Sequence, residues 1–307
     1  MSPVMTQPRS ILPGATYLLT RRVLRRHLLL RPDAAITNLL VYALAVSARR
    51  YGIQVHALCA MSTHLHLVVT DEQGLLPRFL QSFHRIVALG TKVLRAWEGP
   101  VWDHEATSAV LLTTREAVVQ KIAYTLANPV AAGLVVHASE WPGAKVLASE
   151  LGLGVLRAAR PEVDFDASNP DWPEEATLEV SLPPAIGAAE AEDFRREVAA
   201  ELAGAEAKAH AEMHGADVVG ADHAVLVSPH ERATSFEALR ARNPTFAVGH
   251  GNRDAWRRAA AAVRSFRATY RAALERWCAG VRSVLFPAGT WWMRVLHAVG
   301  VSDEAPV

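Results

Sequence analysis

The chain has 307 residues, a length typical of about two domains, and 50% of them are hydrophobic while 21% are charged. This composition supports a packed core and excludes a globally disordered chain. The formal net charge is +1, the two cysteines form no metal-binding or disulfide framework, and no apolar stretch approaches the roughly 20 residues of a membrane-spanning helix.

The N-terminal half alternates β-rich runs with runs that have helical spacing. Asp33 is a suitable N-cap for a helix that Gly52 ends, and Thr114 is a suitable N-cap for a later helix that we expect Pro129 to close. A short polar turn before His64 predicts a hairpin between two strands. The predicted strands are 15–23, 53–60, 65–70 and 106–113, and the predicted helices are 34–51, 75–97 and 115–127.

This order, β-α-β-β-α-β followed by a helix, predicts an α+β fold with a ferredoxin-like antiparallel sheet and helices on one face. The next segment, 143–187, is rich in Pro, Asp and Glu, and we expect it to be an acidic linker. Helices are then predicted over 188–215, 234–241 and 253–279, with a turn and a short helix within 284–301. The expected organisation is therefore a domain over 15–142, the linker over 143–187 and a mainly helical C-terminal region over 188–307.

The small net charge hides an uneven distribution along the chain. Residues 1–142 carry 14 Lys/Arg against 8 Asp/Glu, residues 143–232 carry 7 against 18, and residues 233–307 carry 11 against 5. Two basic blocks thus flank an acidic one. Basic blocks are typical of proteins that bind polyanions, although the surfaces of other soluble proteins also carry such imbalances.

Two histidines, separated by a single leucine, lie on a predicted strand. Side chains alternate faces along a strand, so His64 and His66 point the same way, with their backbones about 6–7 Å apart. Two imidazoles on one face suit two coordination positions of a divalent metal ion. A His-x-His pair also occurs in strands that bind no metal, so this motif needs a second element.

The helix predicted over 115–127 supplies that element. Gln120, Tyr124 and Asn128 recur every four residues and therefore share one stripe of the helix. A metal ion held by two imidazoles and the Asn128 amide oxygen can polarise a phosphate, and a tyrosine hydroxyl beside it can attack the phosphorus. Gln120 is a candidate to orient that hydroxyl. The alternative is that Tyr124 only packs the helix against the sheet.

Three segments, MSTHLHLVVT, WDHEATSAVLLT and YTLANPVAAGLV, resemble the single-tyrosine transposases of the His-hydrophobic-His superfamily, in particular the REP-associated tyrosine transposases. The resemblance spans about residues 16–142. In it His64 and His66 match the metal-binding histidines, and Tyr124, four residues before Asn128, matches the nucleophile. Ser62 and Thr63 stand where the family more often has Pro and Asn.

The resemblance implies an endonuclease and strand transferase that cuts and rejoins single-stranded or hairpin DNA through a 5′-phosphotyrosine intermediate, as a monomer or a homodimer. An open site that accepts phosphate favours Mg²⁺ or Mn²⁺ over zinc. The alternative is a domesticated, catalytically altered DNA-binding protein. A third possibility is an RNA-processing ferredoxin-like domain, an explanation that the presence of Tyr124 makes unnecessary.

Basic side chains in three parts of the sequence are candidates for contact with DNA phosphates. At 100° per residue, the C-terminal set falls within a stripe of roughly 80°, separate from an apolar face that includes Phe266 and Tyr270. The alternative for this stripe is a solvated face that partly pairs with the acidic block. The three sets are Arg21, Arg22, Arg25 and Arg26; Arg78, Arg85 and Lys92; and Arg253, Arg257, Arg264, Arg267 and Arg271.

The N-terminal residues lack the charged, apolar and small-residue pattern of a secretory signal. Together with the sparse cysteines, this predicts a cytoplasmic location and no membrane partner. DNA is the expected partner.

Overall fold

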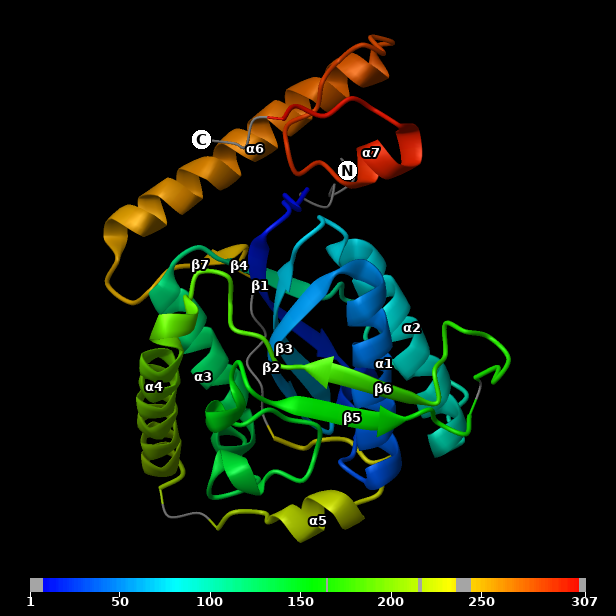
Figure 1. The fold of residues 1–307 in the computed structure, drawn as a ribbon, viewed down its shortest axis with the longest axis vertical. Helices are drawn as coiled ribbons and strands as arrows, with labels where there is room; N and C mark the ends of the chain where they lie inside the picture. The colour runs from blue at the N-terminus through cyan, green and yellow to red at the C-terminus, as the bar shows by residue number, and fades with distance from the viewer. Residues whose placement is uncertain (1–7, 164, 215–216, 236–243, 304–307) are drawn as a thin grey trace.

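The computed structural model describes residues 8–163, 165–214, 217–235 and 244–303. A mixed sheet forms its centre, helices lie on both sides of the sheet, and a long helix crosses one end of the molecule (Figure 1). The strands are β1 (Ala15–Arg22), β2 (Ile53–Ala60), β3 (His64–Asp71), β4 (Ser108–Leu112), β5 (Val155–Ala159), β6 (Glu175–Glu179) and β7 (Phe246–Ala247). The helices are α1 (Ala34–Tyr51), α2 (Leu76–Arg95), α3 (Arg115–Ala131), α4 (Ala191–Glu212), α5 (Ala221–Leu226), α6 (Arg253–Cys278) and α7 (Trp292–His297).

The main sheet has the strand order β2-β3-β1-β4-β7. The first four strands pair antiparallel, in the order expected of a ferredoxin-like sheet, and β7 adds a parallel edge strand. The predicted element order β-α-β-β-α-β is therefore confirmed, as is the α+β class. The edge strand β7 was not predicted, because two residues are too few to show a strand period.

The two crossover helices lie together on one face of the sheet. Leu39 of α1 lies against Gly90 of α2, where a Cβ atom would approach the leucine to 2.7 Å. Arg21 of β1 points to the same face, since its guanidinium lies 5.7 Å from the Trp102 ring centroid and Trp102 Nε1 donates to the His84 carbonyl of α2. The next residue of the strand, Arg22, therefore points to the opposite face, which α3 covers. Figure 1 shows α1 and α2 to one side of the sheet, and α3 and α4 to the other.

Local capping signals correctly predict where α1 and α3 begin. The Asp33 carboxylate accepts the Ile36 N–H, and Gly52 ends α1 in the left-handed conformation with φ 61°. Thr114 caps α3 by accepting the Ala117 N–H. The expected end of α3 is wrong, because the helix continues through Pro129 to Ala131. A proline inside a helix removes one hydrogen bond, and here burial of Pro129 and Val130 accompanies the added turn.

The expectation of a linker over 143–187 is corrected by the structure. This segment forms the hairpin β5–β6, which packs against α1. The Asn38 side chain of α1 bonds both backbone groups of Ala159, at 2.9 and 3.1 Å. Val146 and Leu178 are buried in the same core as the main sheet. In β6, Glu175 and Glu179 are exposed while Ala176 and Leu178 between them are buried, so the acidic composition alone suggests a linker.

One part of the C-terminal region packs against the domain, and another part forms a separate small core. Phe194 and Val198 of α4 are buried in the main core beside α3. Farther along, α6 and α7 enclose a small core of their own around Phe286. Most of the helix expected over 234–241 lies outside the described residues. Within the described part of the chain, no helix combines the length and apolarity needed to span a bilayer.

A buried histidine makes stability depend on pH. His56 is fully buried, its Nδ1 bonds the Ser181 carbonyl at 2.9 Å, and its Nε2 bonds the Thr70 hydroxyl at 2.8 Å. Burial lowers the pKa of His56 to about 4. Below pH 6.5, His56 therefore binds a proton in the unfolded chain but stays neutral in the folded chain. The free energy of unfolding falls as the pH falls from about 6.5 towards 4.

Because of His56, we expect the free energy of unfolding to decrease by about 2 kcal/mol when the pH is lowered from 7 to 5. Urea denaturation at the two pH values measures the loss. A His56→Gln variant should be less stable at pH 7 but should lose about 2 kcal/mol less than the wild type over that range. An identical pH dependence in both proteins would contradict the prediction.

Candidate functional site

Strand β3 presents two histidines on the face covered by α3. The imidazole centroids of His64 and His66 lie 4.8 Å apart, and the rings are nearly perpendicular at 89°. His66 is 3% exposed, whereas His64, nearer the strand end, is partly exposed. The period of two along the strand thus places both rings side by side, as the sequence predicts.

A threonine hydroxyl orients each imidazole. Thr20 lies opposite His66 in the β1–β3 register, and its Oγ1 is 2.9 Å from His66 Nδ1. Thr63 Oγ1 is 2.9 Å from His64 Nδ1. A hydroxyl can donate or accept a hydrogen bond, so it can orient either tautomer of the imidazole. Because the threonine occupies Nδ1 in both rings, Nε2 is the nitrogen that would bind a metal. Thr63 is also a position where the chain departs from the pattern that it resembles.

Helix α3 brings a tyrosine and an asparagine to these rings. The Tyr124 ring lies 5.4 Å from the His66 ring at 81°, and its side chain is 41% exposed. Asn128 donates from Nδ2 to the Tyr124 carbonyl at 2.9 Å, which directs Oδ1 to His64 Nε2 at 3.4 Å. Lys121 Nζ is 5.4 Å from the Tyr124 ring centroid. A partly exposed tyrosine ring, a positive charge and two imidazoles therefore lie close together.

The donor set suits a hard divalent cation with open coordination positions. Two imidazole Nε2 atoms and the Asn128 amide oxygen are compatible with Mg²⁺ or Mn²⁺, which favour oxygen and tolerate nitrogen. Among the described residues, no group of three His, Cys, Asp or Glu side chains comes together to hold a metal ion.

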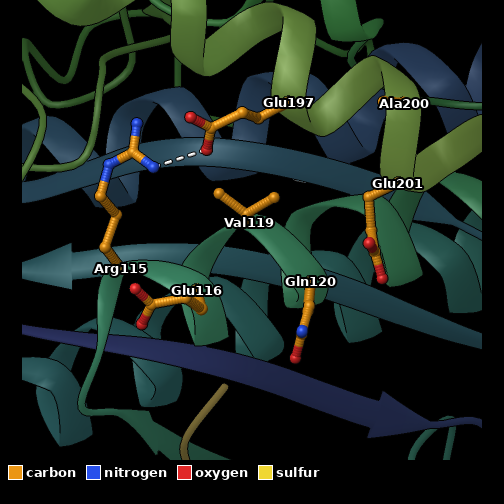
Figure 2. Close-up of a pocket in the computed structure, with 7 residues that line it drawn as sticks. All are labelled: Arg115, Glu116, Val119, Gln120, Glu197, Ala200 and Glu201. Carbon is orange, nitrogen blue, oxygen red and sulfur yellow. Dashed lines mark hydrogen bonds and ion pairs between the residues drawn. The ribbon is translucent and has the colours of Figure 1, made fainter. Parts of the chain in front are cut away.

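Gln120 lies one turn before Tyr124 and faces a cavity between α3 and α4. The cavity has a volume of about 420 Å³. Figure 2 shows Gln120 beside Glu201 of α4, and an ion pair between Arg115 and Glu197 that joins the two helices at 2.5 Å. The role of Gln120 in orienting the Tyr124 hydroxyl stays a prediction.

The N-terminal arginines separate onto two faces. Arg22 of β1 lies opposite His64 of β3, so its exposed side chain points to the same face of the sheet as the two histidines. Arg21 points to the opposite face, where it donates to the Asp103 and Glu105 carbonyls.

The turn that follows β1 carries the other two arginines of this set. Arg25 is exposed, and Arg26 donates to the Ser235 hydroxyl at 2.8 Å. Both have a positive φ, of 49° and 58°, which is uncommon for arginine. Of the four, the register therefore brings Arg22 to the histidines.

The structure does not bring the second basic set to the histidines. Arg78, Arg85 and Lys92 lie on α2, which packs on the other face of the sheet. The Arg78 guanidinium lies 5.9 Å from the Trp291 ring centroid. Contact between these three side chains and DNA stays a prediction. The third set lies on α6.

Sequence reasoning missed three residues of the site. Thr20 and Thr63 orient the imidazoles, and Lys121 lies over the tyrosine ring. The spacing of three between Lys121 and Tyr124 on one helix was a usable signal. No sequence signal pointed to Thr20, because it contacts His66 only through the pairing of two strands that are distant in sequence.

No protein-family model and no curated protein matches the chain. Solved structures similar to it include one described as a REP-associated tyrosine transposase bound to a REP hairpin, with 18% identity, a TM-score of 0.39, and coverage of 54% of this chain and 94% of that chain. Another is a protein of Deinococcus radiodurans R1 provisionally described as a transposase, with 20% identity, a TM-score of 0.29, and coverage of 40% and 97%. At these TM-scores, the function has to be inferred from the residues of the site.

Proposed function

We propose that this chain is a metal-dependent endonuclease and strand transferase that cuts and rejoins single-stranded or hairpin DNA through a phosphotyrosine at Tyr124. One observation carries the proposal. The Tyr124 ring lies 5.4 Å from the His66 ring, and Asn128 of the same helix reaches His64 at 3.4 Å. A nucleophilic hydroxyl beside a metal-binding donor set is the arrangement that phosphodiester cleavage needs.

The side chains divide the work between binding and attack. Mg²⁺ or Mn²⁺, held by His64, His66 and the Asn128 oxygen, would withdraw charge from the phosphate. Arg22, in register with His64, is placed to bind a neighbouring phosphate. Lys121 adds positive charge beside the ring of Tyr124, where the phosphate has to approach.

The attack exchanges one ester for another. The Tyr124 oxygen forms a bond to phosphorus and loses its proton, while the bond from phosphorus to the 3′ oxygen breaks and that oxygen takes up a proton. The tyrosine is then joined to a 5′ phosphate, and the other strand end carries a free 3′ hydroxyl. Because the phosphotyrosine ester conserves the bond energy, a 3′ hydroxyl can attack it and reseal the strand without ATP.

Trapping the ester tests the proposal. Hairpin DNA labelled at its 3′ end is incubated with the protein and Mn²⁺, and denaturing gels should show a labelled protein band that EDTA prevents. The same DNA labelled at its 5′ end should release a free fragment and label no protein. A protein labelled only by the 5′-end probe would overturn the assigned polarity. Binding without any adduct would favour the non-catalytic DNA-binding protein.

A further inference from the structure

Helix α6 carries a row of arginines along one flank. Arg253, Arg257, Arg264 and Arg271 are exposed, and Arg267 is partly buried between them. The helix has 26 residues, so the row extends over roughly 27 Å of its length at 1.5 Å per residue. Phe266 and Ala273 are buried on a different flank, which holds α6 to the small core around Phe286. Figure 1 shows that α6 crosses one end of the molecule.

The charge of this row is barely compensated. Arg257 forms an ion pair with Asp254 at 3.2 Å, and both of these side chains are exposed. Across the described residues, Arg253, Arg264, Arg267 and Arg271 form no ion pair with a carboxylate of the chain. Like charges three, four and seven residues apart on one helix repel each other, so a polyanion that binds here would relieve this repulsion.

A further arginine extends the row from the N-terminal segment. Arg9 donates to the Thr107 carbonyl at 2.8 Å and lies near Arg267. Arg267 Nε is buried and has no hydrogen-bond partner among the described residues. Arg9 therefore adds one more guanidinium group beside Arg267 at the edge of the row.

The row also starts near the helix that carries the tyrosine. Gly249, just before α6, lies against Glu116, where a Cβ atom would approach the glutamate Cβ to 2.5 Å. Glu116 and Tyr124 are eight residues apart on α3, roughly 12 Å along the helix. DNA that reaches Tyr124 can therefore continue towards α6.

We propose that the α6 row, extended by Arg9, binds the phosphate backbone of a double-stranded DNA segment that flanks the reacting strand. This proposal rests on the proposed function, because it assumes DNA as the substrate. Guanidinium groups on exposed helix positions contact phosphates without reading bases, so binding here is independent of sequence. The site works without metal and is separable from Tyr124.

Two double variants of the same helix test the proposal. Arg264→Gln/Arg271→Gln removes two charges from the row, whereas Arg258→Gln/Arg276→Gln removes two exposed arginines from the other flank of α6. The probe is a fluorescein-labelled 20-base-pair duplex in EDTA, and its dissociation constant is measured between 50 and 300 mM NaCl. Matching melting temperatures show that both variants are folded.

In the Arg264→Gln/Arg271→Gln variant, the plot of the logarithm of the association constant against the logarithm of the salt concentration should be less steep by about two. Binding of the duplex should be roughly 10- to 100-fold weaker at 0.1 M salt. The control variant should bind like the wild type. Equal slopes for the row variant and the wild type, or equal losses in both variants, would overturn the proposal and assign α6 to protein contacts. Duplex binding that depends on the row in a protein that forms no adduct would support this inference while overturning the proposed catalysis.

Discussion

A Tyr124→Phe variant is expected to form no covalent adduct with hairpin DNA, a loss of roughly 10⁴-fold or more. The substitution removes the oxygen that attacks phosphorus and leaves the ring that packs beside His66. Because the side chain is 41% exposed, the fold should be unaffected. The dissociation constant for the same DNA in EDTA should match that of the wild type.

The remaining tyrosines provide the control. Tyr17 and Tyr42 are buried, and burial raises the pKa of Tyr17 to about 12, so neither is available as a nucleophile. Tyr51→Phe, at the end of α1 on the other side of the sheet, should form the adduct at the wild-type level. An adduct that persists in Tyr124→Phe, or that mass spectrometry maps to another tyrosine, would show that the active site is elsewhere.

Removing the two imidazoles is expected to have the next largest effect. A His64→Ala/His66→Gln variant should lower metal-dependent cleavage by roughly 10²-fold or more, because two of the three protein ligands lose their ring nitrogens. Glutamine keeps most of the buried volume at position 66, which is 3% exposed, and so limits the cost to stability. Calorimetric titration with Mn²⁺ should show weaker binding.

A surface histidine supplies the matched control for this variant. The His104 side chain is 88% exposed and lies in the loop before β4, so His104→Ala should cleave DNA and bind Mn²⁺ like the wild type. Full cleavage by the His64→Ala/His66→Gln variant would contradict the assignment of the metal site. A loss of cleavage with unchanged Mn²⁺ affinity would also contradict it.

Patterns within single segments are enough to predict much of this protein. Caps at Asp33 and Thr114 locate helix starts, because a cap acts on backbone groups two or three residues away. The period of a strand puts His64 and His66 on one face, and the period of a helix puts Tyr124 and Asn128 on one stripe. These are local properties of the backbone, so they hold before any long-range contact forms.

Other features depend on which segments meet, and no local period encodes that. The pairing of β1 with β3 brings Thr20 to His66 and Arg22 to His64, and the packing of α3 on this sheet brings Asn128 within 3.4 Å of His64. Segment 143–187 has the composition of a linker, yet it folds as a hairpin because α1 offers it an apolar face and the hydrogen bonds of Asn38. Long-range burial and strand register, set by the whole chain, place these residues together.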